Sequence, residues 1–344
     1  MITQLGKCEF LLEKYLAICL QQESRNATTR DILKENVEHT CDLVAYAVEG
    51  FEHYLPVKLL VTPELNLTNL PFHTAKENSA VAIQIPGPET DAIGESARKY
   101  RCYVVVGALE KDQQWPLVFN SLLLIDPKGS LILKYRKVNP WIPVETTCSP
   151  HDLLPAGYNE QLFPVAKTPI GNIGCYICYD GLFPEVTRQL ALNGAEILIR
   201  VSFYPDPYGT QPTDWWSIVN RVRSIENTAY GICCQSGSKL DTAPPYSSPG
   251  HSMIVDWEGR TLAEAGRGEC IIAAALDIDM LRHVRLNSRL HNMLAHLRSS
   301  AYDYWKMQPY GSHPEYAKKS DLTVQELDDA IKESRDKFYK KHYK

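Results

Sequence analysis

Short apolar runs alternate with amphipathic segments along most of the chain. The apolar runs are rich in β-branched and aromatic residues and are bounded by proline, glycine or aspartate, which predicts strands. In the first half, the predicted strands lie at residues 15–20, 58–62, 103–107, 119–126 and 131–135. The last two flank Pro127-Lys128-Gly129 and are predicted to pair as a hairpin.

The longest amphipathic segment of this half follows Asp31. Its apolar residues recur every three or four positions, which predicts a helix with one buried face formed by Leu33, Val37, Cys41, Val44 and Val48. Thr28 and Asp31 predict a capping box at its start, and Gly50 predicts its end. A further helix is expected to open at Gly87–Thr90.

The second half repeats this order of elements. Strands are predicted at residues 170–178, 195–201, 231–235, 252–256, 260–264 and 271–276. Helices are predicted at residues 184–193 and 213–229, the second with Ile218, Val222 and Ile225 on one face. Interleaved strands and helices indicate an α/β fold in which helices cover the faces of sheets. No linker interrupts the chain before about Asp279.

The remainder of the chain has a different character. Arg282–Arg298 is basic and contains three histidines. Thr323 and Glu326 predict a capping box for a last helix, in which Leu327, Ile331 and Phe338 share a face. Such a helix could pack on its own domain or form an arm that packs on a neighbouring subunit, and the arm is the favoured interpretation.

The composition is that of an ordinary globular protein. Apolar residues make up 44% of the 344 residues and charged residues 22%, and the net charge is only -5, which gives no indication of a nucleic-acid partner. Charged residues interrupt the apolar N-terminus, and no apolar run is long enough to predict a membrane span. The ten cysteines are therefore expected to be reduced thiols of a cytoplasmic protein.

Candidate chemistry centres on Cys178, at the end of a predicted strand and ahead of Asp180-Gly181 and Pro184-Glu185. Exposed backbone N–H groups and a helix dipole at such a strand-to-helix turn favour a thiolate. Taken alone, however, a cysteine in an apolar strand is more often a small core residue. Cys175 lies three positions earlier, but residues three apart on a strand face opposite sides, which disfavours a redox or zinc pair. No metal or cofactor is expected.

Two charged residues, Glu64 and Lys137, follow predicted strands, and a third, Glu145, lies close behind them in the sequence. Glu64 comes directly after Leu59-Leu-Val-Thr-Pro63, Lys137 ends the run that starts at Leu131, and Glu145 lies eight positions further on. Open α/β sheets carry their chemistry at the carboxyl ends of strands. Each residue alone could simply mark the point where the chain reaches solvent. No histidine ends a predicted strand, which disfavours a cysteine–histidine pair.

Four segments taken together resemble a known signature. Pro63-Glu64, Tyr135-Arg136-Lys137, Pro140–Glu145 and Cys178–Glu185 are similar, in order and spacing, to the motifs of the nitrilase (carbon–nitrogen hydrolase) superfamily. They most resemble its aliphatic amidase and formamidase branch. The resemblance implies a four-layer αββα sandwich that pairs face to face in a homo-oligomer. It implies a hydrolase domain over residues 1–300, with residues 301–344 as a helical extension and possible oligomerisation arm.

The resemblance also implies roles for these residues. Cys178 is expected to be the nucleophile and Glu64 the general base. Lys137 and the backbone N–H of Tyr179 are expected to stabilise the oxyanion, and Glu145 to position the substrate nitrogen and the partners of Glu64.

Substrate contacts are expected from Tyr179, Trp141 and Leu65. Leu65 and the segment 146–150 depart from the usual amidase pattern, which suggests a different or roomier acyl site. Nitrilases typically carry Trp-Glu after the nucleophile, so Tyr179-Asp180 favours an amide over a nitrile.

The expected function is hydrolysis of a small aliphatic amide to a carboxylic acid and ammonia through a thioester on Cys178. Nitrile hydrolysis, hydrolysis of a ureido or carbamoyl compound, and acyl transfer to an amine remain alternatives on the same residues. A catalytically silent binding subunit is the non-enzyme alternative. Retention of Glu64, Lys137, Glu145 and Cys178 argues against it, because a silent site has no need of buried charged groups. No nucleic-acid or membrane partner is expected.

Overall fold

The computed structural model describes residues 12–71, 73–203, 212–237, 250–303, 306 and 310–342. Within these residues the strands form two six-stranded sheets. Sheet A has the order β12-β1-β2-β3-β4-β5, and its strands in that order are Cys270–Leu276, Tyr15–Gln21, Val57–Val61, Tyr103–Glu110, Phe119–Ile125 and Leu131–Arg136. Strands β1, β2 and β3 are parallel, whereas β12, β4 and β5 pair antiparallel with their neighbours.

Sheet B has the order β11-β10-β9-β8-β7-β6. Its strands in that order are Thr261–Glu264, Met253–Val255, Tyr230–Gln235, Ile197–Ser202, Gly171–Ile177 and Val165–Thr168. Here β7, β8 and β9 are parallel, and β6, β10 and β11 are antiparallel to their neighbours. The two sheets thus have the same arrangement: three parallel strands, a hairpin on one side and an antiparallel strand on the other.

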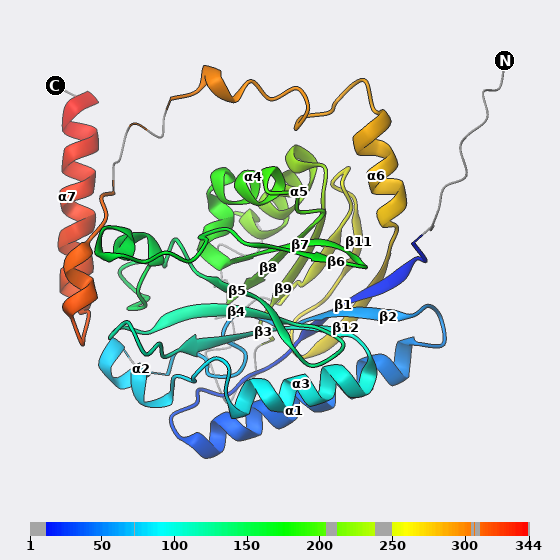
Figure 1. Ribbon diagram of the computed structural model, residues 1–344, viewed down its shortest axis with the longest axis horizontal. Coiled ribbons are helices and arrows are strands. Elements are labelled where there is room, and N and C mark those ends of the chain that lie inside the picture. Colours follow the sequence, from blue (N-terminus) through cyan, green and yellow to red (C-terminus); the bar gives the residue numbers. More distant parts are fainter. Residues whose placement is uncertain are drawn as a thin grey trace.

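Helices cover the outer face of each sheet. Helices α1 (Arg30–Phe51) and α3 (Pro88–Tyr100) lie on sheet A, and α4 (Pro184–Leu192) and α5 (Trp215–Asn227) lie on sheet B (Figure 1). The layers are therefore α, β, β and α, so the predicted fold class is confirmed. Helices α2 (Ala75–Val81), α6 (Ile278–Asn287) and α7 (Val324–His342) lie at the periphery (Figure 1).

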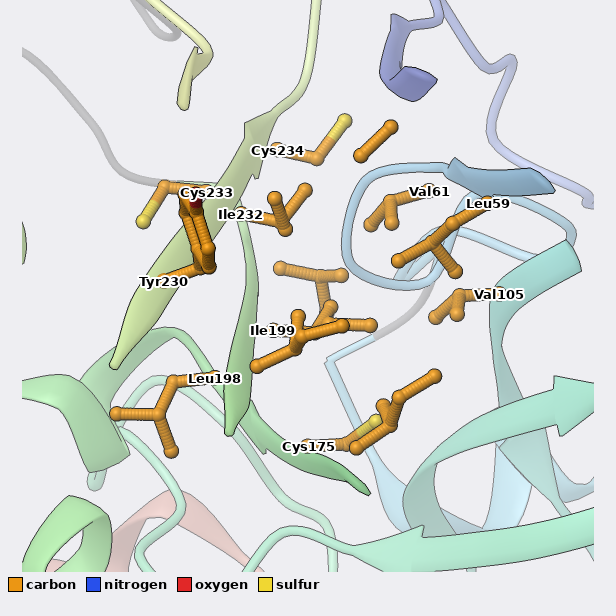
Figure 2. Packing of buried hydrophobic residues seen from close by; sticks show 14 of the residues in the cluster. Leu59, Val61, Val105, Cys175, Leu198, Ile199, Tyr230, Ile232, Cys233 and Cys234 are labelled. Atoms are coloured by element: carbon orange, nitrogen blue, oxygen red, sulfur yellow. The ribbon is translucent and has the colours of Figure 1, made fainter. Parts of the chain in front are cut away.

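The main core lies between the two sheets. Leu59 and Val61 of β2 and Val105 of β3 pack in one buried cluster with Ile199 and Ile232 of sheet B (Figure 2). The alternating residues of sheet A, such as Leu60 and Val104, pack instead beneath α1 and α3. Because the central strands are buried on both faces, their sequences are continuous apolar runs rather than alternating ones. This double burial explains why the strands were visible in the sequence.

Most predicted elements agree with the structure, with shifts at their ends. Helix α1 is capped by Thr29, which accepts a hydrogen bond from Ile32 N at 3.3 Å, so the predicted cap at Thr28 is wrong by one residue. The predicted strand 170–178 ends at Ile177, because Cys178 begins a short 3-10 helix. No helix in the described part of the chain combines the length and apolar character that crossing a membrane requires.

The C-terminal extension contributes buried side chains to its own domain. Tyr316, Leu322 and Leu327 are buried in one hydrophobic cluster with residues of the main domain, including Trp115 and Leu153. The predicted capping box of α7 is present, since Thr323 and Glu326 exchange backbone-to-side-chain hydrogen bonds at 3.0 and 3.3 Å. The first part of the extension thus packs on its own domain. An arm that reaches a neighbouring subunit stays a prediction.

Replacing Leu327 by alanine should destabilise this packing. The side chain is only 2% exposed, and removing a buried leucine side chain costs about 2–5 kcal/mol. Urea unfolding should therefore show a lower free energy of unfolding, or a separate early transition, for Leu327→Ala. The control is Val324→Ala on the same helix, where the side chain is 42% exposed. Equal stability of the two variants would contradict the packing of α7 on the domain.

Candidate active site

Glu64 lies in a tight turn just beyond the end of β2. The next residue, Leu65, has a φ of 52°, a left-handed conformation that a leucine adopts only where its surroundings enforce it. The turn lies against Gly107 of β3, where a Cβ atom would come within 2.6 Å of the Leu65 nitrogen. A glycine at this position lets the turn approach β3. The turn is thus fixed by packing, and the Glu64 side chain is buried.

Lys137 directly follows β5, and only 1% of its side chain is exposed. Its ammonium Nζ donates to Glu64 Oε1 at 2.8 Å and to Glu145 Oε2 at 2.6 Å. Burial acts to lower the pKa of Lys137, but Glu145 and Glu64 outweigh it and raise this pKa well above its ordinary value. The lysine is therefore charged at neutral pH and holds both glutamates.

Asn120 on β4 bonds to the same two carboxylates. Its Nδ2 donates to Glu64 Oε1 and to Glu145 Oε1, each at 2.8 Å. Its backbone carbonyl accepts a hydrogen bond from Lys137 N at 2.9 Å. One asparagine thus fixes the start of the lysine segment and the spacing of both glutamates.

Glu145 is surrounded by hydrogen-bond donors. Besides Lys137 and Asn120, the Thr147 hydroxyl donates to it at 2.8 Å and the Trp141 backbone N–H at 3.0 Å. Burial acts to raise the pKa of Glu145, but Lys137 outweighs it and holds this pKa below its ordinary value. Glu145 is therefore a fully bonded carboxylate, which suits positioning rather than proton transfer.

Cys178 lies in a constrained turn at the end of β7. It begins the 3-10 helix η2 (Cys178–Leu182) and has a φ of 47°. Arg200 of β8 holds this turn, because its Nε and Nη2 donate to the Cys178 carbonyl at 3.1 and 2.7 Å. A side chain at Gly181 would overlap the Arg200 guanidinium, so glycine is required there. The Tyr179 N–H lies in the first turn of η2, where N–H groups lack partners within the helix.

The Cys178 thiol is buried beside the charged cluster. Burial and the charge of Glu64 raise the pKa of Cys178 to about 12, whereas Lys137, Ser202 and Arg200 act to lower it. At neutral pH the sulphur therefore carries its proton. A nucleophilic attack by this sulphur requires a base, and Glu64 is the neighbouring carboxylate that interacts with it.

The two sheets meet at this cluster. The backbone N–H of Phe203, directly after β8 of sheet B, donates to Glu64 Oε2 at 2.8 Å. Glu64 and Lys137 are held by sheet A, and Cys178 by sheet B. The structure therefore brings together the three residues predicted to form a triad, with Glu145 bonded to the lysine.

Asp180 connects the cysteine turn to the lysine segment. It accepts hydrogen bonds from the Tyr135 hydroxyl at 2.7 Å and from Ile177 N at 3.1 Å, through Oδ2. Its Oδ1 accepts from Asn139 N and Asn139 Nδ2, each at 2.9 Å. Burial raises the pKa of Asp180 to about 6, although these hydrogen bonds act to lower it. The residue ties β5, the segment after Lys137 and the start of η2 together.

The residues predicted to contact substrate lie around this cluster. Tyr179 is half-buried and makes an edge-to-face contact with Phe183, at 5.2 Å between ring centroids. Trp141 is half-buried next to Glu145. Leu65 packs into the hydrophobic cluster that also contains the C-terminal residues. Their contacts with substrate stay predictions. Within the described ranges, no group of three or more His, Cys, Asp and Glu side chains is arranged to hold a metal ion.

Residues 19–286 match the family model described as carbon-nitrogen hydrolase. The chain belongs to the carbon–nitrogen hydrolase family. It is 32% identical over 252 residues to a formamidase of Bacillus cereus (strain B4264), covering 72% of this chain and 70% of the relative. This carbon–nitrogen hydrolase therefore lies near the amidase and formamidase branch of the nitrilase superfamily, as the sequence motifs indicated, and acts on carbon–nitrogen bonds other than peptide bonds.

Solved structures share the fold of this carbon–nitrogen hydrolase. Saccharomyces cerevisiae Nit3, a member of branch 10 of the nitrilase superfamily, superimposes with a TM-score of 0.66 at 24% identity, covering 82% of this chain and 97% of Nit3. A mutant of the amidase from Nesterenkonia sp. AN1 superimposes with a TM-score of 0.64 at 18% identity, covering 86% of this chain and 99% of the amidase. In that amidase the acetamide moiety of fluoroacetamide is covalently added at the active-site cysteine.

Sequence reasoning missed several residues of the hydrolase site. Asn120 and Arg200 are polar residues inside otherwise apolar strands, Phe119–Ile125 and Ile197–Ser202, and that contrast was the available signal. Asp180 was used only as part of the sequence that follows the nucleophile, and its link between β5 and the cysteine turn was missed. Nothing in the sequence pointed to Phe203, because it contributes a backbone N–H rather than a side chain.

A buried ion pair lies on the strand that presents Lys137 to the hydrolase site. Arg136 donates through Nε and Nη2 to Glu110 at the end of β3, at 2.8 and 2.5 Å. Lys134 and Ser121 also donate to Glu110, at 2.9 and 2.5 Å. Burial acts to raise the pKa of Glu110, but Arg136 and Lys134 outweigh it and hold this pKa below its ordinary value. The pair fixes the end of β5 from which Lys137 follows.

The stability of a Glu110→Gln variant should depend on pH in a defined direction. Because folding lowers the pKa of Glu110, its ionisation stabilises the folded chain above the unfolded-state pKa and loses this effect as pH falls through the folded-state pKa. Removing one partner of a buried pair costs about 3–5 kcal/mol, so the variant should be less stable by that amount at pH 7. Urea unfolding should show that the difference in free energy of unfolding between parent and variant becomes smaller below about pH 4.

The control for this measurement is Glu38→Gln on α1, where the side chain is 63% exposed. Exposed substitutions change stability by less than about 0.5 kcal/mol, so this variant should follow the parent at every pH. The free energy of unfolding of Glu110→Gln could instead differ from that of the parent by a constant amount from pH 7 to pH 3.5. That result would contradict a stabilising role for the charge of Glu110.

Proposed function

We propose that this carbon–nitrogen hydrolase is an amidase that converts a small aliphatic amide to a carboxylic acid and ammonia through a thioester on Cys178. The observation that carries the proposal is the position of Lys137, which is buried, bonded to both Glu64 and Glu145 and in electrostatic contact with the thiol. Such an arrangement supplies a nucleophile, a carboxylate base and a fixed positive charge at one point.

In the first step, the Glu64 carboxylate takes the proton of the Cys178 thiol as the sulphur attacks the amide carbonyl carbon. A base is needed because the buried thiol is protonated at neutral pH. The new S–C bond uses a sulphur electron pair, and the carbonyl π electrons move to oxygen. Lys137 and the Tyr179 N–H are the proposed partners of this oxyanion.

In the second step, the tetrahedral intermediate collapses and its C–N bond breaks. Glu64 returns the proton to the departing nitrogen, so ammonia leaves and the acyl group remains on Cys178 as a thioester. Water then attacks the thioester while Glu64 takes one of its protons. Collapse of this second intermediate releases the acid and restores the thiol, so one carboxylate serves both half-reactions.

Glu145 has a supporting role in this mechanism. Four donors already satisfy its oxygens, so it fixes Lys137 and Asn120 rather than exchanging protons. We infer that it also sets the position of the substrate nitrogen through these partners.

The substrate class is proposed from the relatives together with the site. A formamidase is 32% identical to this chain, and a structural neighbour is an amidase with an acetamide moiety on its cysteine. The first protein is named for action on formamide, and the second carries a two-carbon acyl group derived from fluoroacetamide. We infer that the amide carbonyl of a short aliphatic substrate meets Cys178, with Tyr179 and Trp141 as walls.

Ammonia release from short amides should depend on Cys178. Formamide, acetamide, propionamide, short nitriles and ureido compounds are screened with the parent protein and with Cys178→Ala. We expect ammonia and acid from at least one amide, and a loss of about a thousandfold or more in the variant, as for other catalytic nucleophiles. Mass spectrometry of the quenched parent should show the acyl group on the Cys178 peptide.

The matched control is Cys175→Ala, which changes a buried core cysteine three residues earlier on the same strand. Its activity should stay close to that of the parent. Ammonia release by Cys178→Ala at the parental rate would refute the nucleophile. Turnover of nitriles or ureido compounds without turnover of any amide would refute the substrate class.

We further propose that a second copy of the chain packs on α5. Ile218, Val222 and Ile225 form an apolar stripe on this helix that is 54%, 41% and 38% exposed, and Leu192 at the end of neighbouring α4 is 52% exposed. The helix uses its opposite side, including Trp216, to pack on sheet B. An exposed stripe of this kind on a covering helix supports an interface between subunits.

A charge in this stripe should dissociate the oligomer. Val222→Glu places a carboxylate in the proposed interface, where it would be buried without a partner. Sedimentation velocity should show the parent as a dimer or larger and the variant shifted toward the monomer. The control is Tyr46→Glu on α1, where the side chain is 66% exposed on a different helix. A monomeric parent, or an unchanged assembly of Val222→Glu, would refute this interface.

A further inference from the structure

Ser202 is the last residue of β8 and lies next to the nucleophile turn. Strands β7 and β8 pair in parallel with Ile177 opposite Val201, so the next residues along each strand, Cys178 and Ser202, are neighbours. The residue after Ser202 is Phe203, whose N–H donates to Glu64. Ser202 therefore lies between the groups that hold the proposed nucleophile and the proposed base.

The Ser202 hydroxyl is completely buried. Among the described residues, no group makes a hydrogen bond of ordinary length and angle with its Oγ. The group that it does interact with is the Cys178 thiol, since the hydroxyl acts to lower the pKa of that cysteine. Burying a hydroxyl without a good partner is unfavourable, and such groups are rare in folded proteins. The unfavourable burial of this hydroxyl therefore indicates that it has a role beside the sulphur.

We propose that Ser202 is a further catalytic residue, whose hydroxyl donates a hydrogen bond to the Cys178 sulphur as negative charge forms there. The proposal rests on the nucleophile assignment made under the proposed function. It adds a donor for the sulphur itself, whereas Lys137 and the Tyr179 N–H serve the substrate oxygen.

The chemistry of this step is balanced without any further reactant. Glu64 takes the thiol proton, and the sulphur then holds the electron pair that forms the S–C bond. The Ser202 hydroxyl keeps its own proton throughout and donates it only as a hydrogen bond. Two donors of strand β8 thus act on one residue, since Arg200 bonds to the Cys178 carbonyl and Ser202 interacts with the Cys178 side chain.

Ser202→Ala should lower activity through the sulphur. A hydrogen bond to a charged group changes a rate by roughly tenfold to a hundredfold, so kcat/KM for the amide substrate should fall by that factor. Alkylation of Cys178 by iodoacetamide, followed at fixed pH by mass spectrometry of its peptide, should slow by about threefold to tenfold, because less thiolate is present. Ser202→Thr retains the hydroxyl and should restore most of both rates.

The matched control is Ser224→Ala on α5. Ser224 also has a completely buried hydroxyl without a partner of ordinary geometry among the described residues, but it does not adjoin the thiol. This variant should retain the parental kcat/KM and alkylation rate. Unfolding of both alanine variants in urea checks that each is folded at the assay temperature.

Two results would overturn the role of Ser202. One is a Ser202→Ala variant with kcat/KM and alkylation within twofold of the parent. The other is equal loss of activity in Ser202→Ala and Ser202→Thr with unchanged alkylation, which would indicate packing alone. Failure of the nucleophile assignment is distinguishable, because Cys178→Ala would then stay active while the alkylation comparison still reports on the contact between Ser202 and the sulphur.

Discussion

A buried ammonium held between two buried carboxylates is the interaction on which the rest of the site depends. Removing three charges from water is expensive, and such a cluster persists only when every oxygen and proton finds a partner. Asn120, Thr147, the Trp141 N–H and the Phe203 N–H supply those partners. They come from separate segments, so the strands and turns that carry them have little freedom to move. The electrostatic requirement of Lys137 thus fixes the geometry around Cys178.

The two sheets contribute different chemical groups to the site. Sheet A presents one ammonium between two carboxylates, which leaves one negative charge in excess, and sheet B presents a thiol that is neutral at rest. The resting site therefore holds a net charge that its hydrogen bonds can satisfy. In the proposed mechanism, negative charge moves from Glu64 to the substrate oxygen as the sulphur attacks. The donors for that oxygen are already in place, which is the condition for electrostatic catalysis without reorganisation.

Two features of the fold could be predicted from the sequence: the buried strands and the residues that follow them. Doubly buried strands give continuous apolar runs, so the strands around Leu59 and Val105 were predictable, and Glu64, Lys137 and Cys178 were found because each follows such a run. Contacts between residues far apart in the sequence leave no local pattern. The roles of Asn120, Arg200, Ser202 and the Phe203 N–H depend on such contacts, although a polar residue in an apolar strand did mark the first two. The stripe on α5 was placed on one face correctly, but periodicity alone does not tell which face of a helix the sheet covers.

The pairing of β12 with β1 has a consequence for how the chain is made. Among the described strands, β1 leaves the ribosome before the others, and the strand that covers its free edge begins only at Cys270. Chains fold from the N-terminus during synthesis, so an apolar strand edge stays open until most of the domain has been translated. Open edges of this kind pair readily with other chains. A nascent chain that stalls before Cys270 is therefore a natural client for chaperones, and a truncation there would favour aggregation over partial activity.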